Sequence, residues 1–547
     1  MAEEIELKLT LAEDEQTRFL HHPLLKKAAH CQTETLDNIY YDTPDLALRQ
    51  RGMALRLRRQ GSLWLQTVKQ AGNAAAGLAS RPEWETPYTG QFDFSAIADG
   101  EVRRWLQRPA LLSKLTPVFE TQFERITWRF EVKPRKSSTN GAVLLTLDRG
   151  WIKSGTQRSA ISEIELELYN APVKAIFALA VPLSKKLTLT PAVHSKAARG
   201  YMLHSQTPLQ PVKANEVLYR LAITTGLSPQ AAFTPIALAC LDHLQQNYQG
   251  AVHSEDPEYI HQMRVAMRQL RSALQVFSPQ LPPKMLAALD PPLKKFFWPL
   301  MRQLGHVRDL DVLRTEILLP VLANQDKRRK SALAKQLTDL LAILDQEQRM
   351  ARQKTMAMLT SLAYGHQLLR VLRVLHQPSG QKKSAHLVRF ATQRVRVMEK
   401  HVLQKLRAVL PDQADLPGQQ KNAPLIPDPD ALHLLRIAIK HLRYTLDFFS
   451  PLSGSTAKAA KHLRASTPTE RVLAALQETL GQLTDLAHAG RWLNQQCAQY
   501  QQGQPLTATV SAIGAWHTPR YQKNLASLPK ALQGLQTQLE QNRSAVT

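Results

Sequence analysis

Hydrophobic and polar residues alternate with a period of two in many short runs up to about residue 205. Clear examples are residues 4–9 (EIELKL), 54–58 (ALRLR) and 163–168 (EIELEL), and Gly and Pro separate the runs. Successive side chains of a strand point to opposite faces, so this alternation is typical of β-strands. The pattern predicts an antiparallel β domain with a few helices over residues 1–205.

From residue 214 onward the hydrophobic period becomes that of α-helices. Leu, Ala, Gln, Lys and Arg dominate, and strand-like alternation is almost absent. We therefore expect an all-α domain over residues 214–547, joined to the β domain by the proline-containing segment 205–211. A chain of 547 residues is too long for one hydrophobic core, so the expected fold class is a multidomain α+β protein.

The helical region contains one pattern of basic residues twice, with a spacing of 172 positions between the copies. The residues are His261, Arg264, Arg268 and Arg271 in the first copy, and His433, Arg436, Lys440 and Arg443 in the second. A Leu-Gly pair with an aspartate four residues after the glycine follows each copy, at 304–309 and 480–485. We interpret these as repeats of one helical bundle, at about 214–410 and 428–547, with a proline-rich segment between them.

The charge balance points to an anionic partner. The chain has 70 basic and 45 acidic side chains, a net charge of +25, and residues 211–547 hold 42 of the basic but only 23 of the acidic ones. Such a surface attracts polyanions. The repeated basic helices have few aromatic residues on which bases could stack, so we expect polyphosphate rather than nucleic acid.

Other classes of protein find little support in the chain. The three cysteines, Cys31, Cys240 and Cys497, are far apart and have no zinc-site spacing. No apolar run reaches 18 residues, and the first eight residues are acidic rather than those of a secretory signal. Phosphate-binding loops of the GxxxxGK[ST] type are absent. We expect a cytoplasmic protein with no membrane partner.

Charged residues share one face of each predicted strand. Glu4, Glu6 and Lys8 lie on one face of the first strand and Ile5 and Leu7 on the other. One such strand is ordinarily a solvated outer face over an apolar core. The later strands repeat the arrangement with both signs of charge, so a closed barrel with a charged interior fits, provided that helices or a partner cover its apolar outside.

The residue types on the charged faces divide by chemistry. Carboxylates are hard oxygen ligands suited to Mg²⁺ or Mn²⁺, whereas Arg and Lys match phosphate oxygens. The motif Glu4-x-Glu6-x-Lys8 at the N-terminus resembles the signature of the CYTH superfamily, the triphosphate tunnel metalloenzymes. The resemblance implies an eight-stranded antiparallel tunnel that binds a triphosphate and one or two divalent cations.

The resemblance also implies roles for individual residues. The implied triphosphate-binding bases are Lys8, Arg56, Arg58, Lys69, Arg125 and Lys196, with Arg199 in support. The implied metal-binding carboxylates are Glu4, Glu6, Asp148, Glu163, Glu165 and Glu167, with Glu163 and Glu165 the first choices among the last three. The set expected to carry catalysis is Glu4, Glu6, Lys8, Arg56, Arg58 and Lys69. For Glu83 and Glu85, two readings are equally supported: a role in orienting metal or water, and a salt bridge with Arg81 at the rim. We interpret Arg129 as structural.

The repeated basic helices resemble the CHAD domain, a helical domain often fused to CYTH, over residues 214–547. That resemblance implies a polyphosphate-binding module without a catalytic role. The second repeat departs from the first at Lys440, where the first has Arg268, and in residues 481–485, which lack an arginine equivalent to Arg308.

Three functions remain open from the sequence. The first is a Mg²⁺- or Mn²⁺-dependent hydrolase that converts inorganic tripolyphosphate to pyrophosphate and phosphate, with long-chain polyphosphate bound by the helical domain. The second is a class IV-like adenylyl cyclase, or a thiamine or nucleoside triphosphatase, that uses the same tunnel. The third is a non-catalytic polyphosphate-binding scaffold. We favour the first, since each expected carboxylate and base has an occupant and we find no dedicated base-recognition feature.

Overall fold

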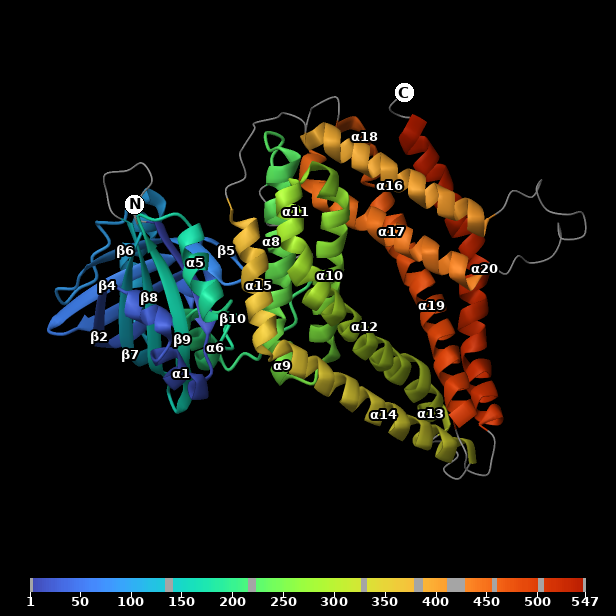
Figure 1. Ribbon diagram of the computed structural model, residues 1–547, viewed down its shortest axis with the longest axis horizontal. Helices are drawn as coiled ribbons and strands as arrows, with labels where there is room; N and C mark the ends of the chain where they lie inside the picture. Colours follow the sequence, from blue (N-terminus) through green and yellow to red (C-terminus); the bar gives the residue numbers. More distant parts are fainter. Residues whose placement is uncertain are drawn as a thin grey trace, which may run out of the picture.

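The computed structural model describes residues 3–132, 141–214, 223–325, 332–377, 387–410, 428–454, 460–499 and 506–544. A β domain that contains the N-terminus lies beside an extended helical domain that contains the C-terminus (Figure 1). No helix within these ranges is both long and apolar enough to cross a membrane. The predicted α+β architecture, with strands first and helices afterwards, is confirmed.

The strands form one antiparallel sheet. Their bounds are β1 Glu3–Thr10, β2 His30–Asp42, β3 Met53–Gln60, β4 Leu63–Gln70, β5 Asn73–Ala75, β6 Leu78–Pro87, β7 Thr116–Val132, β8 Gly141–Ser154, β9 Gln157–Tyr169 and β10 Thr190–Pro191. Eight of them run in the order β1-β9-β8-β7-β2-β3-β4-β6, and β6 pairs back onto β1. The expected eight-stranded closed tunnel is therefore present, with β5 and β10 as short additions to β6 and β1.

Strand alternation separates a charged interior from an apolar exterior. On β1, Leu7 and Leu9 are fully buried and belong to a core that also contains Ile176 and Phe177 of α5 (Lys174–Leu183). Lys8, between them in sequence, instead lines the interior cavity. Helix α5 and, beyond it, the helical domain thus cover the apolar outer face of β1 and β9, as a wet barrel requires.

The β domain also contains several short helices. Their bounds are α1 Gln16–Leu20, α2 Ala47–Gln50, α3 Gly100–Leu106, α4 Pro109–Leu112 and α6 Lys196–Ser205. Helix α6 packs on β7, β8 and β9. Its N-cap is Ser195, whose hydroxyl accepts a hydrogen bond from the N–H of Ala198 at 3.1 Å, so the helix begins at Lys196.

The helical domain begins with α8. The helices are α8 Pro229–Gln246, α9 Tyr248–His253, α10 Pro257–Phe277, α11 Pro283–Pro292, α12 Trp298–Val312, α13 Leu319–Gln325, α14 Ala332–Leu359, α15 Leu362–Leu375, α16 Leu387–Val409, α17 Pro429–Phe449, α18 Lys461–Ser466, α19 Thr469–Gln499 and α20 Thr507–Ser544. Two π-helical turns, Leu293–Phe297 and Leu313–Leu318, continue α11 and α12. Helices α8 and α15 lie nearest the β domain in Figure 1, and α19 and α20 form a long pair farthest from it.

The two repeated basic motifs form equivalent helices that pack against each other. α10 and α17 have the same length, and each begins with a capping aspartate followed by a proline, Asp256 and Asp428 respectively. Most of the proline-rich segment expected between the repeats lies outside the described residues. The residue limits given above for the domains and repeats stay predictions.

Candidate active site and basic cavity

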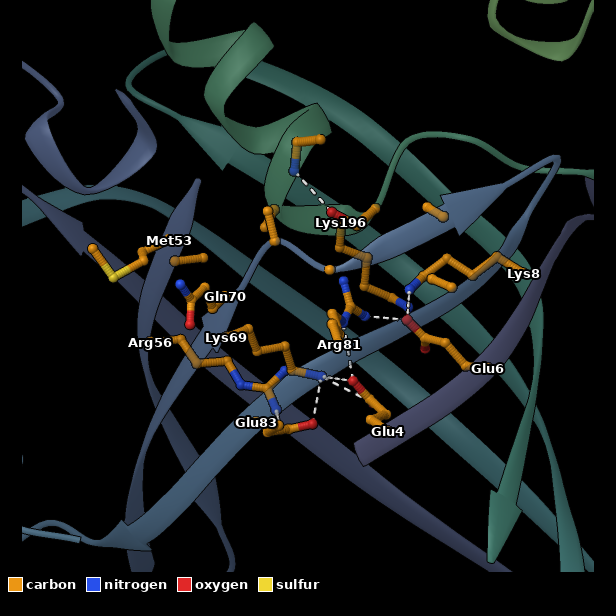
Figure 2. Close-up of a pocket in the computed structure, with 18 of the residues that line it drawn as sticks. Glu4, Glu6, Lys8, Met53, Arg56, Lys69, Gln70, Arg81, Glu83 and Lys196 are labelled. Atoms are coloured by element: carbon orange, nitrogen blue, oxygen red, sulfur yellow. Dashed lines mark hydrogen bonds and ion pairs between the residues drawn. The ribbon is translucent and has the colours of Figure 1, made fainter. Parts of the chain in front are cut away.

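The interior of the barrel is a cavity of about 1150 Å³. Charged side chains from β1, β3, β4, β6, β7, β9 and α6 point into it; Figure 2 shows part of the set. Ten of the residues predicted from the sequence line it: Glu4, Glu6, Lys8, Arg56, Arg58, Lys69, Arg125, Glu165, Glu167 and Lys196. The fold thus gathers residues that are up to 192 positions apart in the sequence, from Glu4 to Lys196.

Acidic and basic side chains neutralise each other where β1, β4 and β6 meet. The ammonium of Lys69 lies 3.0 Å from Glu4 and 2.9 Å from Glu83. The guanidinium of Arg81, which is opposite Glu4 in the β1–β6 register, donates to Glu4 at 3.0 Å and also contacts Glu6. Figure 2 shows these ion pairs on one wall of the cavity.

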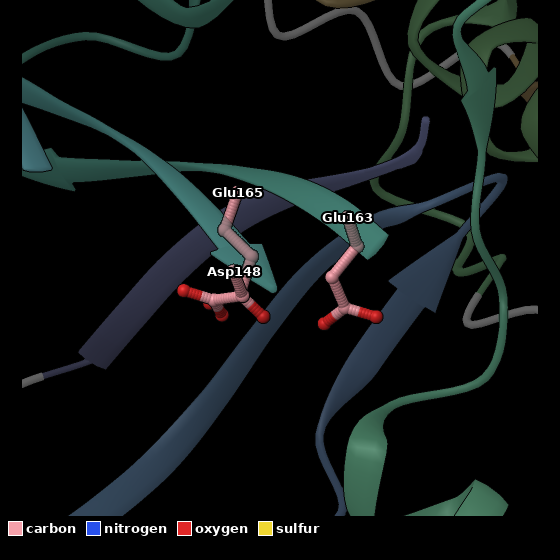
Figure 3. Close-up of side chains that lie close together, drawn as sticks. All are labelled: Asp148, Glu163 and Glu165. Atoms are coloured by element: carbon pink, nitrogen blue, oxygen red, sulfur yellow. The ribbon is translucent and has the colours of Figure 1, made fainter. Parts of the chain in front are cut away.

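A second group of charges lies on β7, β8 and β9, next to β1, and on helix α6. Asp148, Glu163 and Glu165 have oxygens within 4.8 Å of one another, and among the described residues no other carboxylates form such a group of three (Figure 3). The ammonium of Lys196 lies 2.6 Å from Asp148 and 3.1 Å from Glu165, and it contacts Glu163 as well. The guanidinium of Arg125 donates two parallel hydrogen bonds of 2.7 Å to Asp148.

Strand register explains this second group. Arg125 is opposite Asp148 in the β7–β8 pair, Asp148 is opposite Glu163 in the β8–β9 pair, and Glu165 is opposite Lys8 in the β1–β9 pair. Directly opposed residues have neighbouring side chains. Register therefore brings four strands' charges together without any unusual backbone geometry.

Arg56 and Arg58 lie on β3, between β2 and β4. Arg56 donates to Thr67 at 3.2 Å and lies 3.4 Å from Glu83. Arg58 donates to the side-chain oxygen of Asn38 at 3.0 Å and forms no ion pair with any described residue. Burial, together with Arg56 and Arg125, lowers the pKa of Arg58 to about 10. Glu85 acts on Arg58 from a distance but does not form an ion pair with it, so the guanidinium of Arg58 favours an anionic ligand at this point.

The pKa values show which charges crowd the cavity. Burial, and then the nearby Glu4 together with other carboxylates, raises the pKa of Glu167 to about 7. For Glu165, burial opposes ionisation, but Lys196, Lys8 and Arg125 hold its pKa well below the usual range. Burial likewise opposes the charge of Lys196, yet Asp148, Glu163 and Glu165 raise its pKa. Only Lys69 acts against the rise at Glu167, whereas Glu165 forms ion pairs with Lys8, Arg125 and Lys196.

Carboxylates that suit a divalent cation gather at two places in the barrel. Glu4, Glu6 and Glu167 come from paired strands, with Glu6 opposite Glu167, and burial together with the neighbouring carboxylates raises the pKa of Glu167. The group of Asp148, Glu163 and Glu165 already holds one cation, the ammonium of Lys196. Hard carboxylate oxygens are the ligands that Mg²⁺ and Mn²⁺ take.

Three predicted residues lie outside the cavity lining. Asp148 and Glu163 are almost fully buried behind Lys196, and Arg199 lies 3.4 Å from Glu163. Arg129, interpreted as structural, forms a surface pair with Glu131 at 2.7 Å. Arg81 was not assigned a role in the phosphate site, yet it lines the cavity. Arg81 lies two residues before Glu83 and four before Glu85 on one strand, so the period of two places all three on the same face, and this could have identified Arg81.

The helical domain contains a second charged cavity, of about 530 Å³. Five of the eight predicted polyphosphate-binding residues line it: His261, Arg268, Arg436, Lys440 and Arg443. They come from both repeats because α10 and α17 pack against each other. Lys213, Asp447 and Glu470 also line it and were not predicted, because no repeated motif contains them.

This second cavity is strongly electropositive at its basic end. Burial, followed by Arg268, Arg436 and Arg264, lowers the pKa of Lys440 to about 6. Burial and four neighbouring cations lower the pKa of His261 to about 3. Among the described residues, the Nε atoms of Arg268 and Arg436 are buried without a hydrogen-bond partner. Buried donors of this kind normally have one, so these two donors lack an acceptor within the described part of the chain.

The three remaining predicted residues, Arg264, Arg271 and His433, do not line this cavity. Arg264 packs on Gly305 and pairs with Asp309 at 3.1 Å, and Arg436 packs on Gly481 and lies 4.0 Å from Asp485. The Leu-Gly pair with its aspartate therefore positions one arginine in each repeat. Arg271 stands over the ring of Trp298 at 5.9 Å, and His433 is exposed.

Family models match both parts of the chain. Residues 2–201 match the CYTH domain and residues 235–494 match the CHAD domain. Together these matches account for the tunnel and for most of the helical domain.

Similar proteins are known for each part. Over 206 residues the chain is 31% identical to a Haemophilus influenzae protein named inorganic triphosphatase; the match covers 38% of this chain and 56% of that relative, so it spans about half of the relative's length. A crystal structure of the CHAD domain from Ricinus communis covers 60% of this chain and 97% of its own, with 27% identity and a TM-score of 0.42. A candidate adenylyl cyclase from Hippeastrum, described as having a dominant triphosphatase activity, covers 36% and 95% with 17% identity and a TM-score of 0.26. At these TM-scores the two structures carry no further argument.

Proposed function

Because this chain joins a CYTH domain to a CHAD domain, we propose that it is a metal-dependent inorganic triphosphatase with a polyphosphate-binding helical domain. The reaction is hydrolysis of tripolyphosphate to pyrophosphate and phosphate. The observation that supports it most is the closed barrel whose cavity of about 1150 Å³ is lined by both bases and carboxylates. The name of the Haemophilus relative, inorganic triphosphatase, agrees with it.

The bases of the cavity are arranged to hold a polyanion. Lys8, Arg56, Lys69, Arg125 and Lys196 all pair with carboxylates, and phosphate oxygens would replace those carboxylates as acceptors. Arg58 offers a guanidinium that no described carboxylate neutralises. Guanidinium groups bind phosphate oxygens through two hydrogen bonds. A chain of phosphoryl groups therefore finds cations on several sides.

The carboxylates released from these pairs would hold Mg²⁺ or Mn²⁺. Glu4, Glu6 and Glu167 at the β1–β9 seam, and Glu165 opposite Lys8, are the proposed ligands that line the cavity. When bound, such an ion draws electron density from phosphoryl oxygens and neutralises charge that develops in the transition state. Asp148 and Glu163 are buried behind Lys196 and anchor that lysine.

Hydrolysis then needs only positioning and charge neutralisation by the chain. Lys8, Arg56 and Arg58 hold the phosphate chain, and a carboxylate of the cavity orients a water for in-line attack at a terminal phosphorus. No protein nucleophile is required.

The helical domain is proposed to bind long-chain polyphosphate in the second cavity. Arg268 and Arg436 present buried Nε donors without partners, one from each repeat. Phosphate oxygens are the acceptors that would satisfy them. The excess positive charge of residues 211–547 extends attraction beyond the cavity.

Product analysis with two ligand variants tests the triphosphatase. The wild-type chain should release one phosphate and one pyrophosphate from each tripolyphosphate with Mg²⁺ or Mn²⁺, and none in EDTA. Glu4→Gln and Glu165→Gln should each lower kcat/KM at least about 100-fold, because each removes a negative ligand oxygen. Glu131→Gln, an exposed glutamate on β7, is the matched control. Wild-type activity in Glu4→Gln and Glu165→Gln would contradict the metal assignment.

A further inference from the structure

One turn of α8 in the helical domain holds the backbone of the tunnel. The carboxylate of Asp242 accepts a hydrogen bond of 2.9 Å from the N–H of Ala76, and both residues are buried. Three positions later, the side-chain amide of Gln245 donates a hydrogen bond of 2.6 Å to the carbonyl oxygen of Pro191. Ala76 lies in the turn that leads into β6, and Pro191 lies in β10; both β6 and β10 pair with β1, the strand of Lys8.

The first of these segments is the turn between β5 and β6. Ala76 and Gly77 both have positive φ, 47° and 90°. A left-handed conformation is unfavourable for alanine, so the surrounding structure must hold it. The carbonyl oxygen of Gly77 accepts the backbone N–H of Lys8 at 3.0 Å. The hydrogen bond that Ala76 donates to Asp242 thus stabilises a turn whose Gly77 carbonyl binds the backbone of Lys8.

The second segment is β10 and the residues after it. The N–H of Ala192 donates to the carbonyl oxygen of Lys8 at 2.9 Å, so both polar backbone groups of Lys8 are bonded to segments held by α8. Lys196 follows Ala192 by four residues. The orientation of the Gln245 amide is fixed because Tyr364 of α15 donates to its oxygen, which leaves its nitrogen for Pro191.

These contacts also reach the carboxylates of β1. The β1–β6 pairing begins directly after the Ala76–Gly77 turn, with Leu7 opposite Leu78 and Glu6 opposite Ala79. A change in the turn therefore moves the seam that closes the barrel. Displacements of about 1 Å in substrate-positioning groups cost enzymes up to roughly 100-fold in rate.

We infer that Asp242 and Gln245 are positioning residues of the tunnel, through which the helical domain sets the placement of Lys8 and Lys196 for triphosphate binding. This inference rests on the proposed triphosphatase activity. It makes the helical domain a part of the active-site scaffold, in addition to any polyphosphate that this domain binds in its own cavity.

Steady-state kinetics on four variants test the inference. Asp242→Ala removes the acceptor, whereas Asp242→Asn keeps one oxygen for Ala76. Gln245→Glu keeps the shape of the side chain but places an oxygen against the carbonyl of Pro191. Gln230→Ala, near the start of α8, is the control. Asp242→Ala and Gln245→Glu should raise the KM for tripolyphosphate at least about tenfold, while Asp242→Asn and Gln230→Ala stay within about twofold of wild type.

The outcomes separate this inference from the proposed function. Unchanged KM in both Asp242→Ala and Gln245→Glu would overturn the positioning role, as would a loss in Asp242→Asn equal to that in Asp242→Ala. Should Asp242→Ala fail to fold, Gln245→Glu alone decides. If the wild-type chain releases no phosphate, the proposed function fails, and calorimetric binding of tripolyphosphate to the same variants tests the positioning role with the same expected ranking.

Discussion

The ammonium nitrogen of Lys196 lies 2.6 Å from a carboxylate oxygen of Asp148. The same ammonium contacts Glu163 and Glu165, so one lysine occupies the centre of the one three-carboxylate group found among the described residues. Lys196 is also a proposed ligand of the substrate. The ammonium of Lys196 can therefore neutralise either the three carboxylates or a phosphate group of the substrate. When it binds phosphate, another cation must neutralise the carboxylates.

Replacing this lysine should make the fold depend on divalent cations. Lys196→Met leaves three buried carboxylates with Arg125 as their main partner, and removal of one member of a buried ion pair costs about 3–5 kcal/mol. We expect a lower Tm than wild type in EDTA and a larger rise in Tm on adding Mn²⁺, measured by thermal unfolding. Lys153→Met, an exposed lysine 3.4 Å from Glu120, is the control. Equal Mn²⁺ shifts in Lys196→Met and wild type would count against this role.

Glu167 should make the metal-free protein less stable as pH rises. Its pKa is about 7 in the fold against an ordinary value of 4.5, so between these values the folded chain holds a proton that the unfolded chain has released. The free energy of unfolding then falls as pH rises through this window, by at most about 3 kcal/mol. Glu167→Gln, which is permanently neutral, should lose this decrease in EDTA. Urea unfolding at pH 5 and pH 8 measures it.

Metal should have the same effect as that substitution. A divalent ion at Glu4, Glu6 and Glu167 would favour the ionised carboxylate and lower its pKa. With Mn²⁺ present, the free energy of unfolding of wild type should therefore no longer fall between pH 5 and pH 8 as it does in EDTA. A wild-type pH dependence that is identical with and without Mn²⁺ would argue against metal at this seam.

Polyphosphate binding by the helical domain should take up protons. Lys440 has a pKa of about 6, so it is mostly neutral at pH 7.5, and a bound polyanion favours its charged form. We expect an uptake of up to about one proton per site and an affinity that falls as pH rises from 6 to 8. Calorimetry in buffers of different ionisation enthalpy measures the uptake. Lys440→Met should abolish it, whereas Lys530→Met, exposed on α20, should not.

The two basic cavities should respond separately to substitution. Arg436→Gln removes a buried guanidinium from the second cavity, so polyphosphate affinity should fall about tenfold and its dependence on salt should weaken by about one counterion. Phosphate release from tripolyphosphate should stay within about twofold of wild type, because Arg436 lies outside the tunnel. Loss of both activities in this variant would contradict two independent sites.

Much of the tunnel could be predicted from the sequence because strand alternation is local. The period of two places Glu4, Glu6 and Lys8 on one face, and the same reasoning orients Arg56 and Arg58. Which strands pair, and in which register, is not local. The group of Asp148, Glu163 and Glu165 depends on β7, β8 and β9 being aligned, and no pattern within one strand encodes that alignment.

In the helical domain, too, local patterns could be predicted from the sequence whereas the packing between elements could not. Repetition revealed α10 and α17 and their basic stripes, but it could not show which residues of each stripe face a common cavity. Arg268 and Arg436 do, whereas Arg271 and His433 do not, because the packing of the two helices selects one edge of each stripe. Asp242 and Gln245 have no motif at all, since their role arises only from contact between domains.

The central claim is most directly tested by phosphate release from tripolyphosphate, ATP and thiamine triphosphate side by side, with Mg²⁺ or Mn²⁺. Cations and carboxylates line the cavity together with aromatic residues such as Trp84, Phe123 and Tyr169. Because tripolyphosphate needs only the charged groups, we expect kcat/KM to be highest for tripolyphosphate, by at least about tenfold. Equal kcat/KM for ATP and tripolyphosphate would contradict the account.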